Sequence, residues 1–379
     1  MKLTGVTNAR IVLEDRIVFG SLLVDRDGSI VELDEDAVIR QGLLDLEGDF
    51  LLPGLVDVHT DNLERQVLPR TQARWPSRSA FMAHDGHCVA AGITTVADAL
   101  TVGGIRYESQ RIQTMKDALV DLADLRGLGL FRADHFLHVR CELPAPNFRE
   151  LFEESMASGP VQMVSLMDHT PGGGQYTNLA KFRSARKAEG LDEQAIDFMI
   201  REAQALRDQH AADNRRYVLD RVGHLPVSLA SHDDVDADEI RRNAEDGIMI
   251  SEFPVSMAAA RTAVELGMQT VAGAPNVVRG GSHSGNVAVS DLVAEGCVTA
   301  LASDYYPSAL LESAFWLARH NLCSLPASVA MVTAAPSRML GLTDRGVIAP
   351  GCRADLVRVK EIVGHPLVRG VWRSGERVA

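Results

Sequence analysis

The stretch Gly54–Gln66, GLVDVHTDNLERQ, decides the fold. It follows the turn residue Pro53, its first half is apolar, and that apolar run ends in four polar residues, His59, Thr60, Asp61 and Asn62. An apolar body with a polar carboxyl end is typical of a buried parallel strand that delivers side chains to a site at its end. One such strand can equally be a buried strand that ends at the surface, so the rest of the chain has to separate the two readings.

The same pattern recurs eight times between about Leu51 and Leu342, with longer amphipathic stretches between the repeats. The eight candidate strands are LVDVHTD (55–61), TTVADAL (94–100), HFLHVRCEL (135–143), VQMVSLMDH (161–169), VSLASHDD (227–234), IMISEFP (248–254), TVAGAPN (270–276) and TALASDYYP (299–307). Eight βα units predict a TIM-like (β/α)8 barrel of the α/β class. An open doubly wound sheet is the alternative, but no GxGxxG follows an early strand, and polar ends occur on nearly every strand rather than at one switch point.

One helical stretch stands out by its length. Residues 191–222 form an uninterrupted polar and apolar run that is too long for a minimal barrel helix. We expect a helical insertion or a helix pair there.

The two ends of the chain differ from the middle. Short alternating segments rich in Val and Ile, broken by turn signals such as Asp27-Gly28, fill residues 3–35 and return from residue 346 onward. Such runs predict β strands joined by tight turns, and we read the first group as antiparallel. We therefore expect one small β-sandwich domain built from both termini, with boundaries at 1–51 and 343–379 around a barrel at 52–342.

The composition limits the kinds of partner that the protein is expected to bind. The 379 residues are 46% hydrophobic and 23% charged, with a formal net charge of -13, so a nucleic acid or an acidic membrane would be repelled. Charged residues interrupt the first 19 positions, and no run approaches the roughly 20 apolar residues of a membrane-spanning helix. Five scattered cysteines without a CxxC pair fit reduced thiols. We expect a cytoplasmic homo-oligomer that acts on a small molecule.

The polar strand ends predict a metal centre. Side chains alternate along a strand, so His59 and Asp61 would share a face. Further candidates at strand ends are Glu142, Asp168-His169, His232 with Asp233-Asp234, and Asp304. Imidazole and carboxylate ligands without thiolates suit one or two hydrolytic divalent ions, zinc first and manganese, iron or nickel next. Any one of these residues is most simply a solvated strand end; recurring on five strands, they predict a site at the barrel mouth.

A glycine-rich stretch follows the seventh candidate strand. VVRGGSHSGN (277–286) combines glycines that permit close backbone approach with phosphate donors, and barrels often bind phosphate there. The donors and glycines are Arg279, Gly280, Gly281, Ser282 and His283. A flexible turn is the alternative.

The sequence contains other arginines and histidines that could belong to the site. Arg70 and Arg74 read as solvated surface residues, whereas Arg140 should share a face with Glu142 and point into the barrel mouth. His84 and His87 lie three residues apart on an expected helix before the second strand. We expect them to pack or to orient a neighbour, not to form a second metal pair.

The chain resembles the amidohydrolase superfamily. LLPGLVDVHTDN (51–62), AAGITTVAD (90–98) and RGVIAPGCRADLV (345–357) look like its general framework. Longer segments are similar to a narrower, phosphonate-metabolising group, namely HTDNLERQVLPRTQARWP (59–76), HVRCELP (138–144), VSLMDHTPG (164–172), LASHDD (229–234), GAPNVVRGGSHSGN (273–286) and ASDYYPSALL (302–311). Most superfamily members begin with His-x-His, where this chain and the narrower group have His59-Thr60-Asp61.

The resemblance implies a metal-dependent hydrolase and a set of roles. The implied metal ligands are His59, Asp61, Glu142 as a possible bridge, His169, His232 and Asp304, and Asp304 would also take a proton from the attacking water. Asn62 and Tyr305 join Arg140 and the glycine-rich stretch as substrate-binding residues. The implied reaction converts alpha-D-ribose 1-methylphosphonate 5-triphosphate to the 5-phosphate and pyrophosphate within the carbon-phosphorus lyase pathway.

Two other functions compete with this one. A hydrolase of a C–N bond, acting on a cyclic amide or a nucleobase-like substrate, would use similar ligands, and the Arg279 stretch argues for phosphate instead. A catalytically inactive barrel that serves as an assembly partner would lack ligands. Here the second histidine is replaced by Asp61, which is itself a competent ligand.

Overall fold

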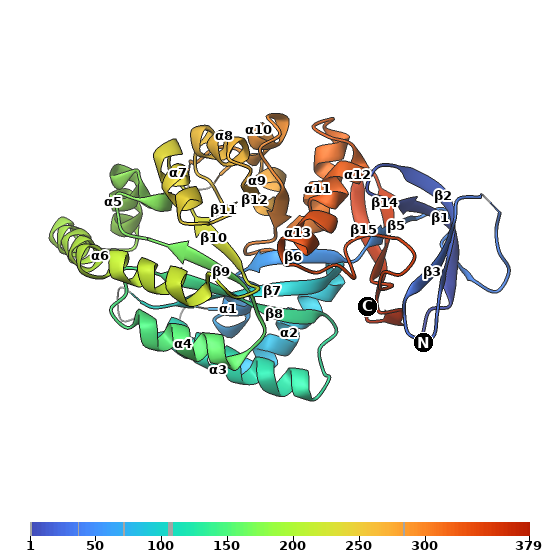
Figure 1. The fold of residues 1–379 in the computed structure, drawn as a ribbon, viewed down its shortest axis with the longest axis horizontal. Helices are drawn as coiled ribbons and strands as arrows, with labels where there is room; N and C mark the ends of the chain where they lie inside the picture. Colours follow the sequence, from blue (N-terminus) through green and yellow to red (C-terminus); the bar gives the residue numbers. More distant parts are fainter. Residues whose placement is uncertain (1, 37, 71–72, 105–108, 283–284) are drawn as a thin grey trace.

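Two sheets organise the chain (Figure 1). The structure is a computed structural model that describes residues 2–36, 38–70, 73–104, 109–282 and 285–379. One eight-stranded sheet is parallel and takes its strands from the middle of the chain, and the other takes its strands from both ends. The predicted class, a TIM-like barrel beside a small β domain, is confirmed.

The parallel sheet contains all eight predicted strands in sequence order. They are β6 (Leu55–Thr60), β7 (Ile93–Val102), β8 (Asp134–Glu142), β9 (Val161–Met167), β10 (Ser228–His232), β11 (Ile250–Glu252), β12 (Gln269–Gly273) and β13 (Ala300–Ala302). A parallel bridge between Thr60 and Asp304 joins the last strand to the first. The Asp304 amide donates to the His59 carbonyl over 3.0 Å, and the Asp61 amide donates to the Asp304 carbonyl over 2.6 Å, so the barrel closes at these residues.

Burial explains why the strands read as apolar runs. Every residue of β6 and of β7 is buried. Small and branched side chains such as Val56, Val58 and Ala97 fill the barrel interior, and larger clusters pack between the strands and the outer helices. Strands covered on both faces cannot show the polar and apolar alternation of a half-exposed sheet.

Helices surround the barrel, and two of them begin directly after strands. In chain order they are α1 (Asn62–Val67), α2 (Ser77–Ala90), α3 (Ser109–Gly127), α4 (Phe148–Ser158), the 3-10 helix η1 (Gly174–Tyr176), α5 (Leu179–Ala188), α6 (Glu193–Val222), α7 (Ala237–Glu245), α8 (Met257–Glu265), α9 (Ala274–Arg279), α10 (Val289–Ala294), α11 (Ala309–Arg319), α12 (Leu325–Ala330) and α13 (Ala334–Met339). The short helices α1 and α9 follow β6 and β12, where the sequence had suggested extended chain or a loop.

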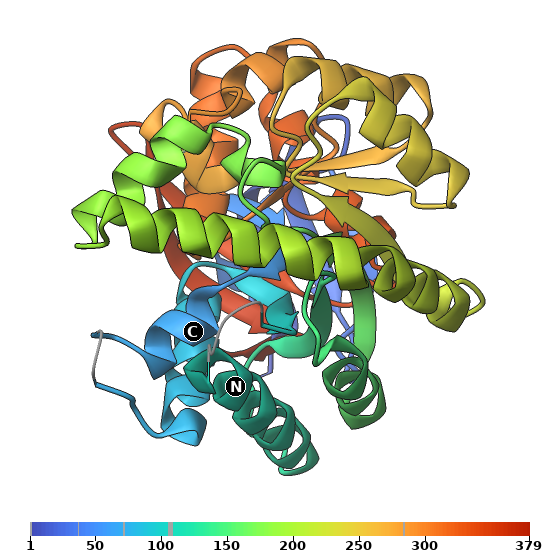
Figure 2. The ribbon, with the colours of Figure 1, turned by 90° about the vertical axis from the view of Figure 1, so that its left-hand side faces the viewer.

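The stretch 191–222 is one continuous helix. α6 has 30 residues and begins after Asp192, whose side chain accepts a hydrogen bond from the Ala195 amide. The alternative of a helix pair within residues 191–222 is therefore wrong, because α6 runs unbroken and the shorter helix α5 precedes this stretch. Figure 2 shows α6 as the long helix that crosses the view in front of the barrel. No helix in the described part of the chain combines the length and the apolar run needed to cross a membrane.

The terminal strands form one mixed sheet. Its strands are β1 (Gly5–Val12), β2 (Ile17–Val24), β3 (Ile30–Asp34), β4 (Leu44–Asp45), β5 (Phe50–Pro53), β14 (Leu356–Ile362), β15 (His365–Arg373) and β16 (Glu376–Arg377). The expected domain from both termini is therefore present, and its strands are hydrogen-bonded into a single sheet where we had expected a sandwich. β1, β2 and β3 pair antiparallel, so the expectation for residues 3–35 is confirmed, and β4 and β5, which follow that stretch, lie parallel to β1. The boundaries at 51/52 and 342/343 stay predictions.

An ion-pair network connects the C-terminal segment to the barrel. The Asp134 carboxylate, at the start of β8, accepts from Arg345 over 2.6 Å, from Arg353 over 2.7 Å and from Arg373 over 3.1 Å. It lies at the end of the barrel opposite the strand carboxyl ends, so the network stabilises the scaffold and leaves the mouth open to ligands.

Candidate metal centre at the barrel mouth

Three strands end in the same unusual backbone conformation. Asp233 directly follows β10, Phe253 directly follows β11, and Asp304 follows β13 by two residues; their φ angles are 59°, 55° and 56°. A left-handed conformation is costly for a residue other than glycine, especially for a bulky one such as phenylalanine, and persists where the surrounding structure imposes it. Three such residues at one end of the barrel mark this end as a built site.

Asp61 reaches the mouth by a different route from the one expected. β6 ends at Thr60, and Asp61 caps the N-terminus of α1, so strand alternation does not place it. Its Oδ1 nevertheless lies 3.5 Å from Nε2 of His59. The prediction that His59 and Asp61 face one point is therefore met, because the chain turns into α1 at this position.

A cavity of about 310 Å3 opens above these strand ends. Its lining includes His59, Asp61, Arg140, His232, Asp233, Phe253, Arg279, Gly281, Ser282, Asn286, Asp304 and Tyr305. Strand ends that are up to 245 positions apart in the sequence thus meet in one pocket. Imidazoles and carboxylates lie together with arginines there, which joins possible metal ligands to possible anion ligands.

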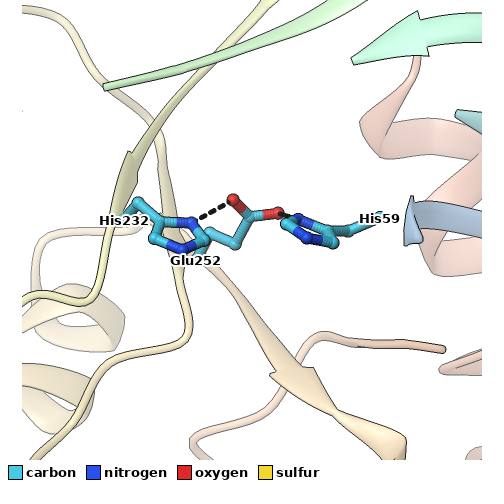
Figure 3. A group of neighbouring side chains, drawn as sticks. All are labelled: His59, His232 and Glu252. Carbon is cyan, nitrogen blue, oxygen red and sulfur yellow. Dashed lines mark hydrogen bonds and ion pairs between the residues drawn. The ribbon is translucent and has the colours of Figure 1, made fainter. Parts of the chain in front are cut away.

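Glu252 lies between two of the imidazoles and contacts both of them (Figure 3). Its Oε1 lies 2.8 Å from Nδ1 of His59, and its Oε2 lies 2.6 Å from Nδ1 of His232. The Glu252 side chain is fully buried. Burial would raise the pKa of Glu252, but the imidazoles of His59 and His138 lower it well below the usual range.

The donor set fits a divalent ion. Nε2 of His59 lies 3.5 Å from the Asp61 carboxylate, and Nε2 of His232 lies 3.6 Å from the Asp233 carboxylate. Because each Nδ1 donates to Glu252, Nε2 is the nitrogen of each ring that faces a carboxylate, and a metal ion that replaced the hydrogen on Nε2 would be bound by both groups. Ligand atoms within 4.8 Å of one another form two such groups, His59, Asp61 and Asp304, and His169, His232 and Asp233.

The protonation of the mouth shows how strongly these groups interact. Burial lowers the pKa of His59, but the carboxylates of Glu252 and Asp61 raise it, to about 10. Burial raises the pKa of Asp304 to about 6, with the nearby Asp61 carboxylate adding to the effect. Carboxylates crowded in this way bind a cation more readily than isolated ones, because the cation removes their mutual repulsion.

Glu142 contacts His169. Its Oε2 lies 2.5 Å from Nδ1 of His169, and its Oε1 accepts from the His169 amide over 3.0 Å. Nε2 of His169 then faces Asp233 at 3.9 Å. Glu142 and His169 are not among the residues that line the cavity, and they lie beside it next to His232 and Asp233.

Arg140 points into the mouth as expected. Its guanidinium donates to Oδ1 of Asp61 over 2.7 Å, and only 7% of its side chain is exposed. Burial raises the pKa of Asp61, but Arg140 and His59 together outweigh that effect and lower it. Nε of Arg140 is buried without a hydrogen-bond partner. A buried guanidinium with an unused donor beside a cavity is suited to bind an anionic ligand.

The predicted glycine-rich stretch begins as a helix. Val277–Arg279 belong to α9, and Gly280 ends it in the left-handed conformation at φ 77°. Arg279 lies in the last turn, and its Nη1 is 3.5 Å from the Tyr305 hydroxyl. Gly281 and Ser282 line the cavity, Gly280 does not, and His283 lies outside the described residues.

Asn62 is not brought to the cavity. Its amide Nδ2 lies 2.8 Å from Nδ1 of His84, whose Nε2 lies 2.6 Å from the Asp98 carboxylate. His84 is thus a packed residue that orients a neighbour, as expected, although this group and His135 also form a cluster of metal-ligand type. Each imidazole nitrogen in it has a hydrogen-bond partner, so the cluster is satisfied without an ion.

The two arginines read as surface residues differ in their contacts. Arg74 pairs with Asp117 at 2.6 Å on the outside of the barrel. Arg70 is exposed. Neither lines the cavity.

Sequence reasoning missed Glu252. The residue stands at the polar end of IMISEFP, the sixth predicted strand, so the pattern that selected the other strand ends was present there too. It was overlooked because its partners His59 and His232 come from other strands, and sequence does not display that contact. Asp233, which was noted only beside His232, also faces the site.

The chain is similar to known proteins over almost its whole length. Residues 50–378 match the model of the amidohydrolase family. Alpha-D-ribose 1-methylphosphonate 5-triphosphate diphosphatase of Escherichia coli (strain K12) is 40% identical over 376 residues, which cover 98% of this chain and 99% of that protein.

Solved structures of similar fold are more distant in sequence. N-isopropylammelide isopropylaminohydrolase from Burkholderia multivorans ATCC 17616 has a TM-score of 0.63 at 19% identity, covering 100% of this chain and 98% of that one. N-acetyl-D-glucosamine-6-phosphate deacetylase from Mycobacterium smegmatis has a TM-score of 0.64 at 14% identity, with both chains covered completely. At these identities the likeness concerns the fold alone.

Proposed function

The chain belongs to the amidohydrolase family, and on that basis we propose that it hydrolyses alpha-D-ribose 1-methylphosphonate 5-triphosphate to the 5-phosphate and pyrophosphate. The family is metal-dependent, and the barrel mouth holds two groups of candidate ligands. The relative that is 40% identical over almost the whole of both chains bears this activity in its name. We also propose that the reaction belongs to the carbon-phosphorus lyase pathway of phosphonate catabolism, as the resemblance to the phosphonate-metabolising group implies.

The composition of the cavity carries the proposal. The chain has a net charge of -13, yet Arg140 and Arg279 line the same pocket as His59, His232 and Asp304. Arginines paired with phosphate oxygens bind a polyanion, which a neutral cyclic amide would not require. The pocket is thus suited to hold a phosphorylated sugar with its reacting phosphorus beside the metal ligands.

We assign the metal to the two ligand groups of the mouth. His59, Asp61 and Asp304 would hold one ion, and His169, His232 and Asp233, with Glu142 behind His169, would hold a second. Zinc is our first choice because the ligands are imidazoles and carboxylates, with manganese, iron and nickel as alternatives. When bound, a divalent ion lowers the pKa of water to about 7 and stabilises negative charge on a phosphoryl group.

The chain's own residues perform the remaining steps. Asp304 is the residue that accepts a proton from the attacking water, because it is buried in the mouth and its pKa of about 6 leaves it ionised at neutral pH. Arg140 binds a phosphoryl oxygen next to the ligands. Arg279, Gly281, Ser282 and Tyr305 also line the cavity, and we assign to them the binding of the departing pyrophosphate.

Phosphorus NMR tests this function directly. Protein with quantified metal content is incubated with the methylphosphonate triphosphate, and separately with ATP and GTP, under zinc, manganese, iron and nickel. We expect pyrophosphate to be released from the methylphosphonate triphosphate, and we expect the Asp304→Asn variant to be at least 100-fold slower while it keeps its fold. Absence of pyrophosphate under all four metals contradicts the proposal, and ammonia release from a cyclic amide would assign the chain to C–N hydrolysis instead.

A further inference from the structure

Glu252 is a buried carboxylate whose close partners are histidines. It ends β11, and no lysine or arginine among the described residues forms an ion pair with it. Its neighbours are imidazoles: His59 at 2.8 Å, His232 at 2.6 Å and His138 at 3.8 Å. An isolated buried carboxylate is costly, so its position requires a compensating role.

His138 does not supply that role. Its Nδ1 lies 3.0 Å from the carbonyl of Val58, and its Nε2 lies 2.9 Å from the Ser165 hydroxyl, so both of its nitrogens are already satisfied. The two strong contacts of Glu252 are therefore those to His59 and His232.

A carboxylate only accepts hydrogen bonds, so it dictates where the hydrogen of each ring lies. Nδ1 of His59 and Nδ1 of His232 must both donate to Glu252, so Nε2 is the nitrogen of each ring that can give up its hydrogen and bind a metal ion. The ring of Phe253 packs against both imidazoles, with centroids 5.0 Å and 5.3 Å away, and limits their rotation. Both rings line the cavity, whereas Glu252 does not.

From this geometry we infer that Glu252 is a positioning residue that presents Nε2 of His59 and Nε2 of His232 to the metal through one carboxylate. The inference rests on the proposed metal-dependent function. It assigns Glu252 behind the ligands, although Glu252, His59 and His232 together have the composition of a metal site. An ion bound at Nε2 lies on the far side of each ring from Glu252.

The variant Glu252→Gln keeps the shape of the side chain, removes its charge and changes where the hydrogens of the two rings must lie. Glutamine offers one carbonyl oxygen, which accepts from one ring, and one NH2 group, which donates to the other. The second ring must then accept at Nδ1 and carry its hydrogen on Nε2, so it can no longer bind an ion. We expect the dissociation constant for zinc to rise about 10- to 100-fold.

Asp355→Asn is the matched control. Asp355 is also a buried acid, but it lies away from the cavity, where its carboxylate accepts from the Ser374 amide and from Arg353. We expect its zinc dissociation constant to stay within about threefold of the unmodified protein. Thermal unfolding of the metal-free proteins shows whether either change disturbs the fold.

The measurement is zinc competition against a chromophoric chelator, combined with 15N spectra of the histidine rings in the zinc-loaded protein. The unmodified protein should show Nδ1–H on both bound rings, and Glu252→Gln should lose this pattern on one. The inference is overturned if either ring binds zinc through Nδ1, or if a folded Glu252→Gln protein binds zinc as tightly as the control. Neither readout uses the substrate, so failure to release pyrophosphate would remove the proposed function and leave this result intact.

Discussion

At the level of single residues, we expect Arg279 to contribute to ligand binding and to contribute little to the stability of the fold. Its side chain is exposed, lines the cavity and contacts the Tyr305 hydroxyl. Hydrogen bonds to charged groups contribute about 1.5 to 3 kcal/mol, so Arg279→Ala should raise KM for the triphosphate about 10- to 100-fold. Its free energy of unfolding should change by less than about 0.5 kcal/mol.

Arg261→Ala is the control for that variant. Arg261 is an exposed arginine of α8 that pairs with Glu295 away from the cavity. Steady-state kinetics and urea unfolding should leave it indistinguishable from the unmodified protein. An unchanged KM for Arg279→Ala would remove this arginine from the anion site.

His135 sets a pH dependence of stability that has no connection with catalysis. Its Nδ1 lies 2.8 Å from Asp98 and its Nε2 lies 3.2 Å from Asp85, so both nitrogens donate to carboxylates and the ring is protonated. Burial lowers the pKa of His135, but the carboxylates of Asp98 and Asp85 together outweigh it and raise the pKa from 6.5 to about 9. The folded state therefore binds more protons than the unfolded state between these two pH values.

The resulting stabilisation is complete below pH 6.5 and is lost as the pH rises through about 9. Its upper bound is on the order of 3 kcal/mol, counted once for the pair with Asp98. Urea unfolding from pH 6 to 9.5 should show this decline in the unmodified protein and in His365→Gln, which changes an exposed histidine. In His135→Gln the decline should be smaller, and an equal slope in all three proteins would contradict the assignment.

The sequence predicted which residues belong to the site better than it predicted which side chains contact one another. His59, Asp61, His232 and Asp304 were expected together and lie together, because each follows an apolar strand in the same barrel. Asn62 stands in the same run of residues, yet its amide is directed to His84. Local sequence does not specify which way a side chain points once a strand gives way to a helix.

At the level of elements, α6 is fixed by a buried asparagine. The Asn214 amide donates to the carbonyls of Leu143 over 2.8 Å and Ala145 over 3.3 Å, in the turn that follows β8 and Glu142. Asn214→Ala would remove the donor to the Leu143 carbonyl, whereas the Ala145 carbonyl still accepts from the Phe148 amide, and we expect a loss of about 2 kcal/mol in the free energy of unfolding. Gln209→Ala, at an exposed position of the same helix, should lose almost none. Equal urea midpoints for the two variants would show that the asparagine contributes nothing.

All eight barrel strands were predictable because burial on both faces makes them uniformly apolar. The short helices α1 and α9 were not, since a single turn of helix after a strand has too few residues to show a period. The parallel pairing of β5 with β1 was also missed. Alternation in a sequence predicts a strand and leaves its direction relative to its neighbours open.

At the level of the whole molecule, Asp134 connects the barrel to the C-terminal segment. Arg345, Arg353 and Arg373 all donate to it, so Asp134→Ala would leave three partly buried guanidinium groups without this acceptor. Removing one partner of a buried pair is strongly destabilising, and we expect a loss of about 3 kcal/mol in urea unfolding.

Asp117→Ala provides the comparison, because Asp117 pairs with Arg74 at the surface, where such a pair contributes less than about 1 kcal/mol. If Asp134→Ala is no more destabilised than Asp117→Ala, the network does not hold the two parts of the chain together.

The barrel closes where the candidate ligands lie. Thr60 and Asp304, which are 244 positions apart, share the closing bridge, and the amides of Asp61 and Asp304 form its hydrogen bonds. Joining such distant segments costs loop entropy that must be recovered by contacts formed late in folding. An ion held by His59 and Asp304 would bind only the closed ring, and mass action would then favour closure. The bound ion would thus stabilise the closed barrel as well as take part in the reaction, and removal of the metal would weaken the barrel first where β6 meets β13.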